Sequence, residues 1–320
     1  MKKKRNMNEL RIGHLSTAYH TAFILMGGRW VEEKMQVKAA WNLFPTGPAM
    51  VQAFKKGELD IGYIGLPPAM IGMEQGLDIK CVGGGHVEGT VVTALAGFQT
   101  IDELGSVEAT LAQFKGKKIG TPSQGSIHDV IIRKLITDAQ LTDTVIIENF
   151  EWADFILEAM EDEEVAGGCG TPPLAVLANR YLKASLVLPP NAIWPYNPSY
   201  GIVATHTMIE DYPTLVESFL QIHEDACNLM RLNPNEASKL AVKEIAIIGE
   251  DFLQQVFRVS PKYCASLPTE YIESTLAFVP VLKKMGYIRR TLTEHDVFEK
   301  SLIEKVHLEA HHYNNPGNLG

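Results

Sequence analysis

Two stretches of this chain share a pattern in which an apolar segment runs into Gly-x-Pro-Pro and then into small and apolar residues. The first reads DIGYIGLPPAM, from Asp60 to Met70, and the second reads GTPPLA, from Gly170 to Ala175. Proline fixes φ and has no N–H, so a proline pair suits the first turn of a helix and disfavours its interior. Each stretch therefore predicts a buried strand that turns directly into a helix, and together they predict two units of the same topology facing one another.

Strand-like and helix-like segments alternate on both sides of these stretches, with short links between them. Ser16-Thr17 is a typical N-cap pair and predicts an apolar helix that runs to about Lys34. This alternation is typical of α/β proteins, so each unit is predicted to hold a mostly parallel sheet flanked by helices. The expected strands are 10–14, 36–44, 60–65 and 79–82 in the first unit, and 117–121, 145–150, 165–169 and 186–188 in the second.

The chain is expected to leave the first unit and later return to it. The proline-rich segment PPNAIWPYNPSYG reads as a crossover loop between the two units. A length of 320 residues also favours two lobes over one domain. Lobe 1 is predicted at 1–93 plus 200–320, lobe 2 at 94–199, and a two-strand hinge near 90–96 and 198–205. A polar helix is expected at 99–116, and amphipathic helices at 207–232, 235–248, 249–259, 269–286 and 293–310.

Charge and hydropathy exclude two classes of partner. The net charge of -9 argues against nucleic acid, because a phosphate backbone is bound by clustered Lys and Arg. No apolar run approaches the roughly 20 residues that span a bilayer.

The basic start Met1 to Arg5 resembles a signal peptide without its apolar region. The expected location is periplasmic or extracellular and membrane-associated if an export segment was removed, and cytoplasmic if the start is native.

The cysteines and histidines do not predict a metal site. Cys81, Cys169, Cys227 and Cys264 are widely spaced and form no CxxC pair, so buried free thiols are expected. A metal would need three or four groups that converge, which the spacing of His14, His20, His86 and His128 does not indicate. Near the C-terminus, HLEAHH places His307 and His311 four residues apart on an expected helix, with His312 adjacent. A solvated helix face is preferred there over metal binding.

The order of motifs resembles one known family. AFKKGELDIGYIGLPPAMIGMEQGLDIKCVGG resembles the first lobe of the NMT1/THI5-like group of solute-binding proteins, and FKGKKIGTPSQGSIHDVIIRKLI resembles the start of its second lobe. This group includes the sulfonate, taurine, nitrate and bicarbonate receptors of ABC importers. The chain departs from the pattern at Val165, where the family usually has Asp. The resemblance implies a type II periplasmic-binding-protein fold, hinge closure on a small solute, and an ABC permease as the partner, with the membrane reached only through that permease.

Candidate ligand-binding residues follow from where the strands end. In open α/β sheets, ligands bind beyond the carboxyl ends of the strands, and a helix N-terminus can hold an anion without any lysine. The turn PSQGSIHD offers backbone donors, an amide and a hydroxyl together. The expected ligand-binding residues are Ser16, Thr17, Tyr19, His20, Gly65, Leu66, His86, Gln124, Gly125, Ser126, Thr171 and Tyr196.

Catalytic signatures are missing, which favours binding over catalysis. The chain has no P-loop, no G-x-G-x-x-G after the first strand, no G-x-S-x-G and no H-E-x-x-H. We therefore predict no catalytic residue and no cofactor. The expected solute is a sulfonate, nitrate or bicarbonate, or a pyrimidine-like molecule. The alternative is an enzyme of similar fold in thiamine-pyrimidine or menaquinone biosynthesis, in which His20 could match a reacting histidine, although no matching lysine lies near it in the sequence.

Overall fold

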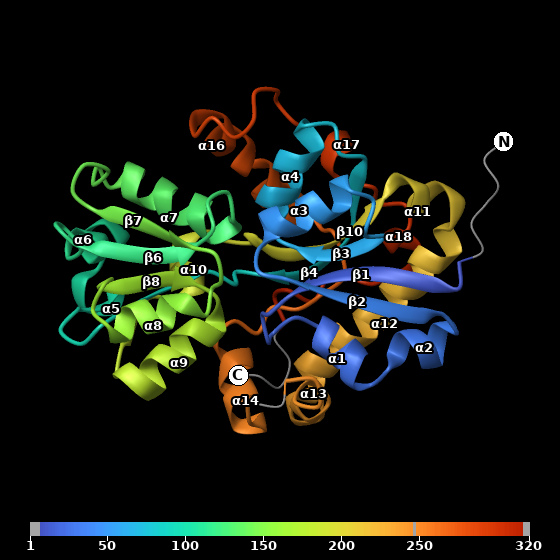
Figure 1. Cartoon of the computed structure of the whole chain (residues 1–320), viewed down its shortest axis with the longest axis horizontal. Coiled ribbons are helices and arrows are strands. Elements are labelled where there is room, and N and C mark those ends of the chain that lie inside the picture. The colour runs from blue at the N-terminus through green and yellow to red at the C-terminus, as the bar shows by residue number, and fades with distance from the viewer. Residues whose placement is uncertain (1–6, 246–247, 316–320) are drawn as a thin grey trace.

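The computed structural model describes residues 7–245 and 248–315 of the chain. Two five-stranded sheets lie side by side, each covered by helices, as Figure 1 shows. Sheet A has the order β2 (Lys38–Phe44), β1 (Glu9–Leu15), β3 (Ile61–Ile64), β10 (Pro198–Thr205) and β4 (Ile79–Val87). Sheet B has the order β7 (Ile146–Phe150), β6 (Lys118–Pro122), β8 (Gly167–Gly170), β5 (Val91–Ala94) and β9 (Ser185–Leu188).

The two sheets share one topology, as the repeated motif predicted. In sheet A, β1 pairs in parallel with β2 and β3, whereas β10 runs antiparallel to β3 and β4. In sheet B, β6 pairs in parallel with β7 and β8, whereas β5 runs antiparallel to β8 and β9. Each sheet thus has four strands in one direction and one reversed strand. The reversed strand is in each case the first strand after the chain has crossed from the other sheet.

The crossings lie just outside the segments expected to form the hinge. Those segments, 90–96 and 198–205, largely coincide with β5 and β10, which are paired within opposite sheets. The chain passes between the sheets at 88–90 and again at 189–197. The lobe boundaries themselves remain a prediction.

Helices cover both sheets, and further helices make up most of the chain after β10. Around sheet A lie α1 (Ala22–Gly27), α2 (Trp30–Met35), α3 (Gly47–Lys55) and α4 (Leu66–Glu74). Around sheet B lie α5 (Ile101–Leu104), α6 (Val107–Ala112), α7 (Ile127–Asp138), α8 (Phe155–Glu161), α9 (Pro172–Leu182) and α10 (Pro190–Ile193). The later helices are α11 (His206–Asp211), α12 (Pro213–Leu232), α13 (Pro234–Ala241), α14 (Glu250–Val259), α15 (Thr269–Leu276), α16 (Phe278–Lys284), α17 (Glu294–Val297) and α18 (Ile303–Val306). None of the described helices has the length and apolar character needed to cross a bilayer.

The predicted helix from Ser16-Thr17 to Lys34 is wrong in both its start and its continuity. Residues 16–21 form turns, and α1 begins only after Thr21. A break at Gly28 and the left-handed Arg29 separates α1 from α2. A Cβ on Gly27 would lie 2.0 Å from the carbonyl oxygen of Leu240, so the glycine pair that ends α1 lets α13 pack closely against it. The turns leave the residues after β1 free to face the other sheet.

The fourth strand is longer than predicted and runs through the glycines Gly83–Gly85 to Val87. A Cβ on Gly84 would lie 2.2 Å from the Tyr313 hydroxyl, and one on Gly85 would lie 2.2 Å from the ring of Tyr200. Glycine is therefore required because aromatic side chains cover this strand. The glycine run that follows the predicted strand is therefore part of the strand and packs against these aromatic side chains.

The long C-terminal helices are divided, and the last one is mostly absent. The 207–232 helix breaks before Pro213, the 269–286 helix divides at Ala277, and 99–116 forms only α5 and α6. Within 293–310 only α17 and α18 form. The solvated helix face expected near the C-terminus is wrong, because His307 follows α18 and its side chain is 2% exposed.

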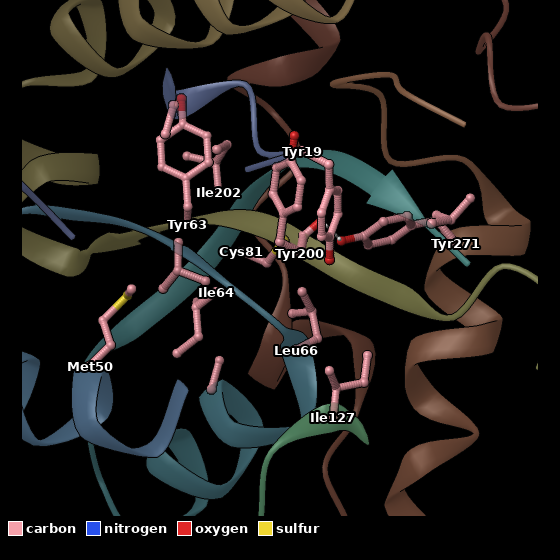
Figure 2. Packing of buried hydrophobic residues seen from close by; sticks show 14 of the residues in the cluster. Tyr19, Met50, Tyr63, Ile64, Leu66, Cys81, Ile127, Tyr200, Ile202 and Tyr271 are labelled. Atoms are coloured by element: carbon pink, nitrogen blue, oxygen red, sulfur yellow. Dashed lines mark hydrogen bonds between the residues drawn. The ribbon is translucent and has the colours of Figure 1, made fainter. Parts of the chain in front are cut away.

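One large core cluster extends through the region between the two sheets. In Figure 2, Tyr19, Tyr63 and Tyr200 gather above β3 and β10, while Leu66 and Ile127 lie close together below them. A smaller cluster lies within the second unit and includes Val165, which is buried against apolar neighbours. The four cysteines are buried and free, as predicted.

Candidate ligand-binding site

A pocket lies between the two sheets, at the carboxyl ends of their strands. One wall follows β1, β2 and β3, and the opposite wall follows β6 and β8, which is where open α/β sheets hold ligands. The lining residues are Leu15, Ser16, Thr17, Tyr19, His20, Pro45, Thr46, Gly47, Gly65, Pro68, Pro122, Ser126, Ile127, His128, Ala153, Thr171 and Ser199.

The N-cap residues of four helices line this pocket. They are Thr46 for α3, Gly65 for α4, Ser126 for α7 and Thr171 for α9. The N-terminus of a helix carries a partial positive charge and unpaired N–H groups. Prolines in the first turns of α3, α4 and α9 remove some of those donors. The helix N-termini therefore favour an anion in the pocket, with the backbone donors concentrated on the helix that lacks these prolines.

That helix is α7, whose start is the turn PSQGSIHD. Ser126 caps it by accepting a hydrogen bond at Oγ from the N–H of Asp129, at 3.2 Å. Asp129 in turn accepts from the N–H of Gly125 at 2.9 Å and from Arg133 Nε at 2.7 Å. These contacts fix the loop and leave the amides of Ile127 and His128 as the first-turn donors at the pocket wall.

Two buried polar atoms at the pocket have no partner. Within the described residues, Thr17 Oγ1 and His20 Nδ1 are buried and form no hydrogen bond, and both residues line the pocket. Buried polar groups in proteins are nearly always hydrogen-bonded. Leaving such a group unpaired costs about 1–3 kcal/mol. Both atoms are therefore available to a bound molecule.

No ionised side chain lines the pocket. None of the seventeen residues named above is Asp, Glu, Lys or Arg. Burial lowers the pKa of His20 well below its usual value, and His86 lowers it further. Burial also lowers the pKa of His128 to about 4. Both rings are neutral at physiological pH, so the helix N-termini supply the electrostatic potential of the site.

Hydrogen-bonded aromatic residues form a rigid floor under the pocket. Tyr19 Oη lies 2.6 Å from Ser199 Oγ, and burial raises the tyrosine pKa above its usual value. The ring of His20 lies 4.0 Å from that of Tyr200, measured between centroids. Behind them, His86 Nε2 lies 2.7 Å from the carbonyl oxygen of Ser260. This packing fixes the side chains that follow β1 relative to the returning strand β10.

The pocket is small and adjoins a second hollow. The space open to the centre of a water molecule is about 40 Å³ in the pocket and about 30 Å³ in the second hollow. Since one water needs roughly 10–15 Å³ on this measure, each space holds only a few heavy atoms. The residues lining both are Ser16, Thr17, Ala153 and Thr171. The rest of the second hollow is lined by Asp154, Leu157, Pro173, Leu174 and Leu177.

The two units touch beside the pocket. A Cβ on Gly65 would lie 3.2 Å from Ile127 Cγ2, so the turn after β3 meets the start of α7 almost directly. Farther out, Tyr287 donates from its hydroxyl to Asp129 Oδ2 at 3.1 Å. On another side Arg180 of α9 pairs with Asp251 of α14 at 2.8 Å. The two units are therefore in contact beside the pocket, and both contribute residues to it.

Seven of the twelve residues proposed from the sequence line this pocket. They are Ser16, Thr17, Tyr19, His20, Gly65, Ser126 and Thr171. Five do not, namely Leu66, His86, Gln124, Gly125 and Tyr196.

Each of the five has a position that explains its absence. Leu66 is fully buried in the core, and His86 lies within β4 behind Tyr19. Gly125 has φ +80°, and the nearest atoms to its Cβ position belong to Ile71 and Pro48. Gln124 adjoins it in the same loop, and the side chain of Tyr196 packs against His311 and Tyr313 of the C-terminal segment.

Sequence reasoning missed several lining residues. Thr46, Gly47 and Pro68 begin α3 and α4, and the rule that ligands bind beyond strand ends could have found the first two. His128 follows the cap of α7, and its Nδ1 lies 3.0 Å from Thr90 Oγ1. Ser199 enters on the reversed strand β10, whose position between β3 and β4 no local pattern indicates.

Comparison with known proteins agrees with this architecture. A model of the NMT1-like family matches residues 3–246. A Bacillus subtilis (strain 168) protein named as an aliphatic sulfonates-binding protein is 22% identical over 314 residues, covering 96% of this chain and 90% of that protein.

Two solved structures share the fold. The alkanesulfonate-binding protein SsuA from Xanthomonas axonopodis pv. citri, bound to MOPS, has a TM-score of 0.78 at 15% identity, covering 93% of this chain and 100% of that one. The periplasmic nitrate-binding protein NrtA from Synechocystis PCC 6803 has a TM-score of 0.74 at 12% identity, covering 95% and 89%. Both chains confirm the predicted two-lobed fold class.

Proposed function

Because the chain belongs to the NMT1-like family, we propose that it is the solute-binding component of an ABC importer. The Bacillus subtilis relative and the two structures of the same fold are named for sulfonate or nitrate binding, which supports this reading over the enzyme alternative. The solute would enter between the two units and be enclosed by hinge closure.

One observation carries the proposal: Thr17 Oγ1 and His20 Nδ1 are buried, unpartnered and at the surface of a pocket that both units form. A molecule that accepts or donates hydrogen bonds there would satisfy both atoms. The pocket offers little to a catalyst. Its lining has no carboxylate, thiol or lysine, and Ser126 already caps α7. Capture and release of a solute require only that the two polar atoms gain hydrogen bonds when the units close, and no covalent bond has to break.

The solute class follows from charge and shape. Four helix N-termini attract an anion, and the amides of Ile127 and His128 would donate to its oxygens. The hollow beside Leu174 and Leu177 would accept a short apolar group. We infer a small organic oxyanion whose head lies between the helix ends and whose tail lies in the second hollow. A sulfonate with a short alkyl chain has this form.

Two other classes of solute that the sequence predicted are compared in the test. Nitrate or bicarbonate would fit the pocket between the helix N-termini and leave the second hollow empty. A pyrimidine-like solute would use Tyr19 as an aromatic neighbour, but it would need more room than the closed pocket offers.

The partner and location follow from the same proposal. An ABC permease would receive the solute from the closed form, and the protein would meet the membrane only through that permease. A receptor of this kind works outside the cytoplasmic membrane, in the periplasm or at the cell surface.

A ligand screen tests the proposal. Purified protein is heated with short-chain and aromatic sulfonates, nitrate, bicarbonate, carboxylates and pyrimidines, and any solute that raises the melting temperature is titrated by calorimetry. We expect one-to-one binding of a sulfonate, strengthened as the alkyl chain grows to fill the hollow. Tighter binding of nitrate than of any sulfonate would overturn the assignment of the tail subsite. No binding by any of these classes would overturn the proposed function.

A further inference from the structure

Four side chains with metal-binding atoms converge where the C-terminal segment folds back onto α12. They are Glu224 of α12, Cys264 in the loop between α14 and α15, and His307 and His312 after α18. None of the four lines the solute pocket. Their ligand atoms all lie within 4.8 Å of one another. We propose that these residues form a tetrahedral metal site of the class that binds zinc.

The distances match such a site. Cys264 Sγ lies 3.3 Å from His307 Nε2 and 3.7 Å from His312 Nδ1. Glu224 Oε1 lies 3.7 Å from His307 Nε2 and 3.2 Å from His312 Nδ1. Zinc bonds of about 2.0–2.3 Å at tetrahedral angles place ligand atoms roughly 3.3–3.7 Å apart. Four of the six edges of the tetrahedron thus lie in or next to this range, and the other two pairs are no more than 4.8 Å apart.

Outer contacts orient two of the ligands, Glu224 and His307, toward the centre of this tetrahedron. Glu224 accepts the N–H of Ala265 with Oε2 at 2.7 Å, which leaves Oε1 facing the cluster. His307 Nδ1 lies 3.0 Å from the carbonyl oxygen of Glu309 and donates to it, so Nε2 is the ring nitrogen that faces the cluster. Histidine ligands in metal sites characteristically make such a hydrogen bond with the second nitrogen. The carboxylate Oε1 and the imidazole Nε2 thus both face the same point.

Burial and charge also favour a cation. Glu224 and Cys264 are buried, and the His307 side chain is 2% exposed. A divalent ion would displace the thiol proton, and its two positive charges would balance one thiolate and one carboxylate. Arg231 lies near enough to influence Glu224, but its guanidinium contacts Asn228 and the carbonyl of Asn315.

The site would hold the C-terminal segment against the body of the protein. Tyr313 donates to the carbonyl oxygen of Cys264 at 2.6 Å and accepts the N–H of Gly85 at 3.2 Å. Asn314 accepts a hydrogen bond from Tyr196, which lies in the returning crossover. Four protein ligands leave no open position, so the metal would be structural. It would fasten this segment over β4 and beside the link between the two units.

Cobalt substitution tests the site directly. Full-length protein is stripped with a chelator and titrated with Co²⁺, which reports a tetrahedral site by strong visible bands and a thiolate ligand by a near-ultraviolet charge-transfer band. We expect one equivalent to bind with both signatures and Zn²⁺ to displace it. Zn²⁺ should also raise the melting temperature, because it binds only the folded form.

Matched variants separate the metal from a merely hydrogen-bonded cluster. Cys264→Ser should abolish the charge-transfer band, and His307→Gln should weaken Zn²⁺ binding by more than about 100-fold, beyond what outer-shell changes cost. His311→Gln is the control, since His311 adjoins His312 but lies outside the cluster, and it should bind like the parent. Protection of Cys264 from a thiol reagent by Zn²⁺ gives a readout on the unaltered protein. Failure of the unaltered protein to bind Co²⁺ or Zn²⁺, or a charge-transfer band that persists in Cys264→Ser, would overturn the proposal.

Discussion

Replacing Thr17 by valine should weaken solute binding while making the empty protein more stable. Thr17 Oγ1 is buried and has no partner among the described residues, so the hydroxyl is desolvated without compensation. Valine keeps the shape and removes the polar atom. Because an unpaired buried hydroxyl costs about 1–3 kcal/mol, the free energy of unfolding should rise by about 1 kcal/mol or more. Binding should lose one hydrogen bond to a charged group, about 1.5–3 kcal/mol, which raises Kd roughly 10–150-fold.

Thr21→Val is the matched control, four residues along the same turn. Thr21 Oγ1 is paired with His223 Nδ1 at 2.9 Å and with the hydroxyl of Tyr200 at 3.2 Å, and Thr21 does not line the pocket. Its loss should lower the free energy of unfolding by about 1–3 kcal/mol because it leaves a buried imidazole nitrogen unpaired. The affinity should stay within twofold of the parent.

Urea unfolding of the empty protein and calorimetric titration with the solute found by the screen measure both effects. The reasoning is refuted if Thr17→Val lowers stability and leaves the affinity unchanged, since Oγ1 would then have a structural partner and no role toward the solute. The opposite signs expected for the two variants make this test insensitive to general damage from mutation.

Three further outcomes are expected. Gly65→Ala should raise Kd severalfold, because its Cβ would lie 3.2 Å from Ile127 Cγ2 across the pocket and 3.2 Å from the carbonyl oxygen of Ser199, and an unchanged affinity measured by calorimetry would contradict the contact with Ile127. Gly85→Ala should destabilise the protein by about 1–3 kcal/mol through overpacking against Tyr200, as urea unfolding would measure. The free energy of unfolding should also fall as the pH drops from 7 to 5, by roughly 2 kcal/mol for each buried neutral histidine. The reason is that histidines in the unfolded chain, with a pKa near 6.5, bind protons that the folded state excludes. A urea midpoint that does not change over this pH range would contradict the prediction. The histidines concerned have pKa values lowered by burial to about 3 for His86, about 4 for His128 and about 4 for His223.

Local rules predicted the fold well where backbone geometry decides the outcome. The proline pairs place α4 and α9 directly after β3 and β8, and these strands occupy the same position in their sheets. The first helix was wrong because its break depends on Gly27 meeting α13, a contact between segments more than 200 residues apart. Gly83–Gly85 misled for a similar reason, since its neighbours come from β10 and the C-terminal segment. A single sequence gives no sign of such distant contacts.

The residues of the candidate site show the same difference between what local rules can predict and what depends on distant contacts. Residues directly at strand ends, such as Thr17 and Thr171, could be found because the carboxyl ends of parallel strands meet at one edge. Gln124 and Gly125 fulfil the same rule, yet a positive φ turns the loop away from the pocket. For the cluster around Cys264 the sequence pointed only to the histidines of HLEAHH, where a solvated helix face was preferred over metal binding; Cys264 could not be joined to them, since it lies 43 residues before His307.

The repeated turn explains how one scaffold can hold a solute from two sides by different means. At Gly65 the N-cap of α4 has no side chain, and the absence of a Cβ lets Ile127 of the second unit approach, so this turn allows close contact between the two units. At Thr171 the same turn carries a hydroxyl at the pocket wall. Both helices begin with prolines and offer few amides, which leaves α7 as the main source of backbone donors. An anion would therefore bind mainly to the second unit while the cleft is open, and Thr17 and His20 would add their hydrogen bonds only as the first unit closes over it. Those late contacts are the ones that would make the closed form depend on the solute.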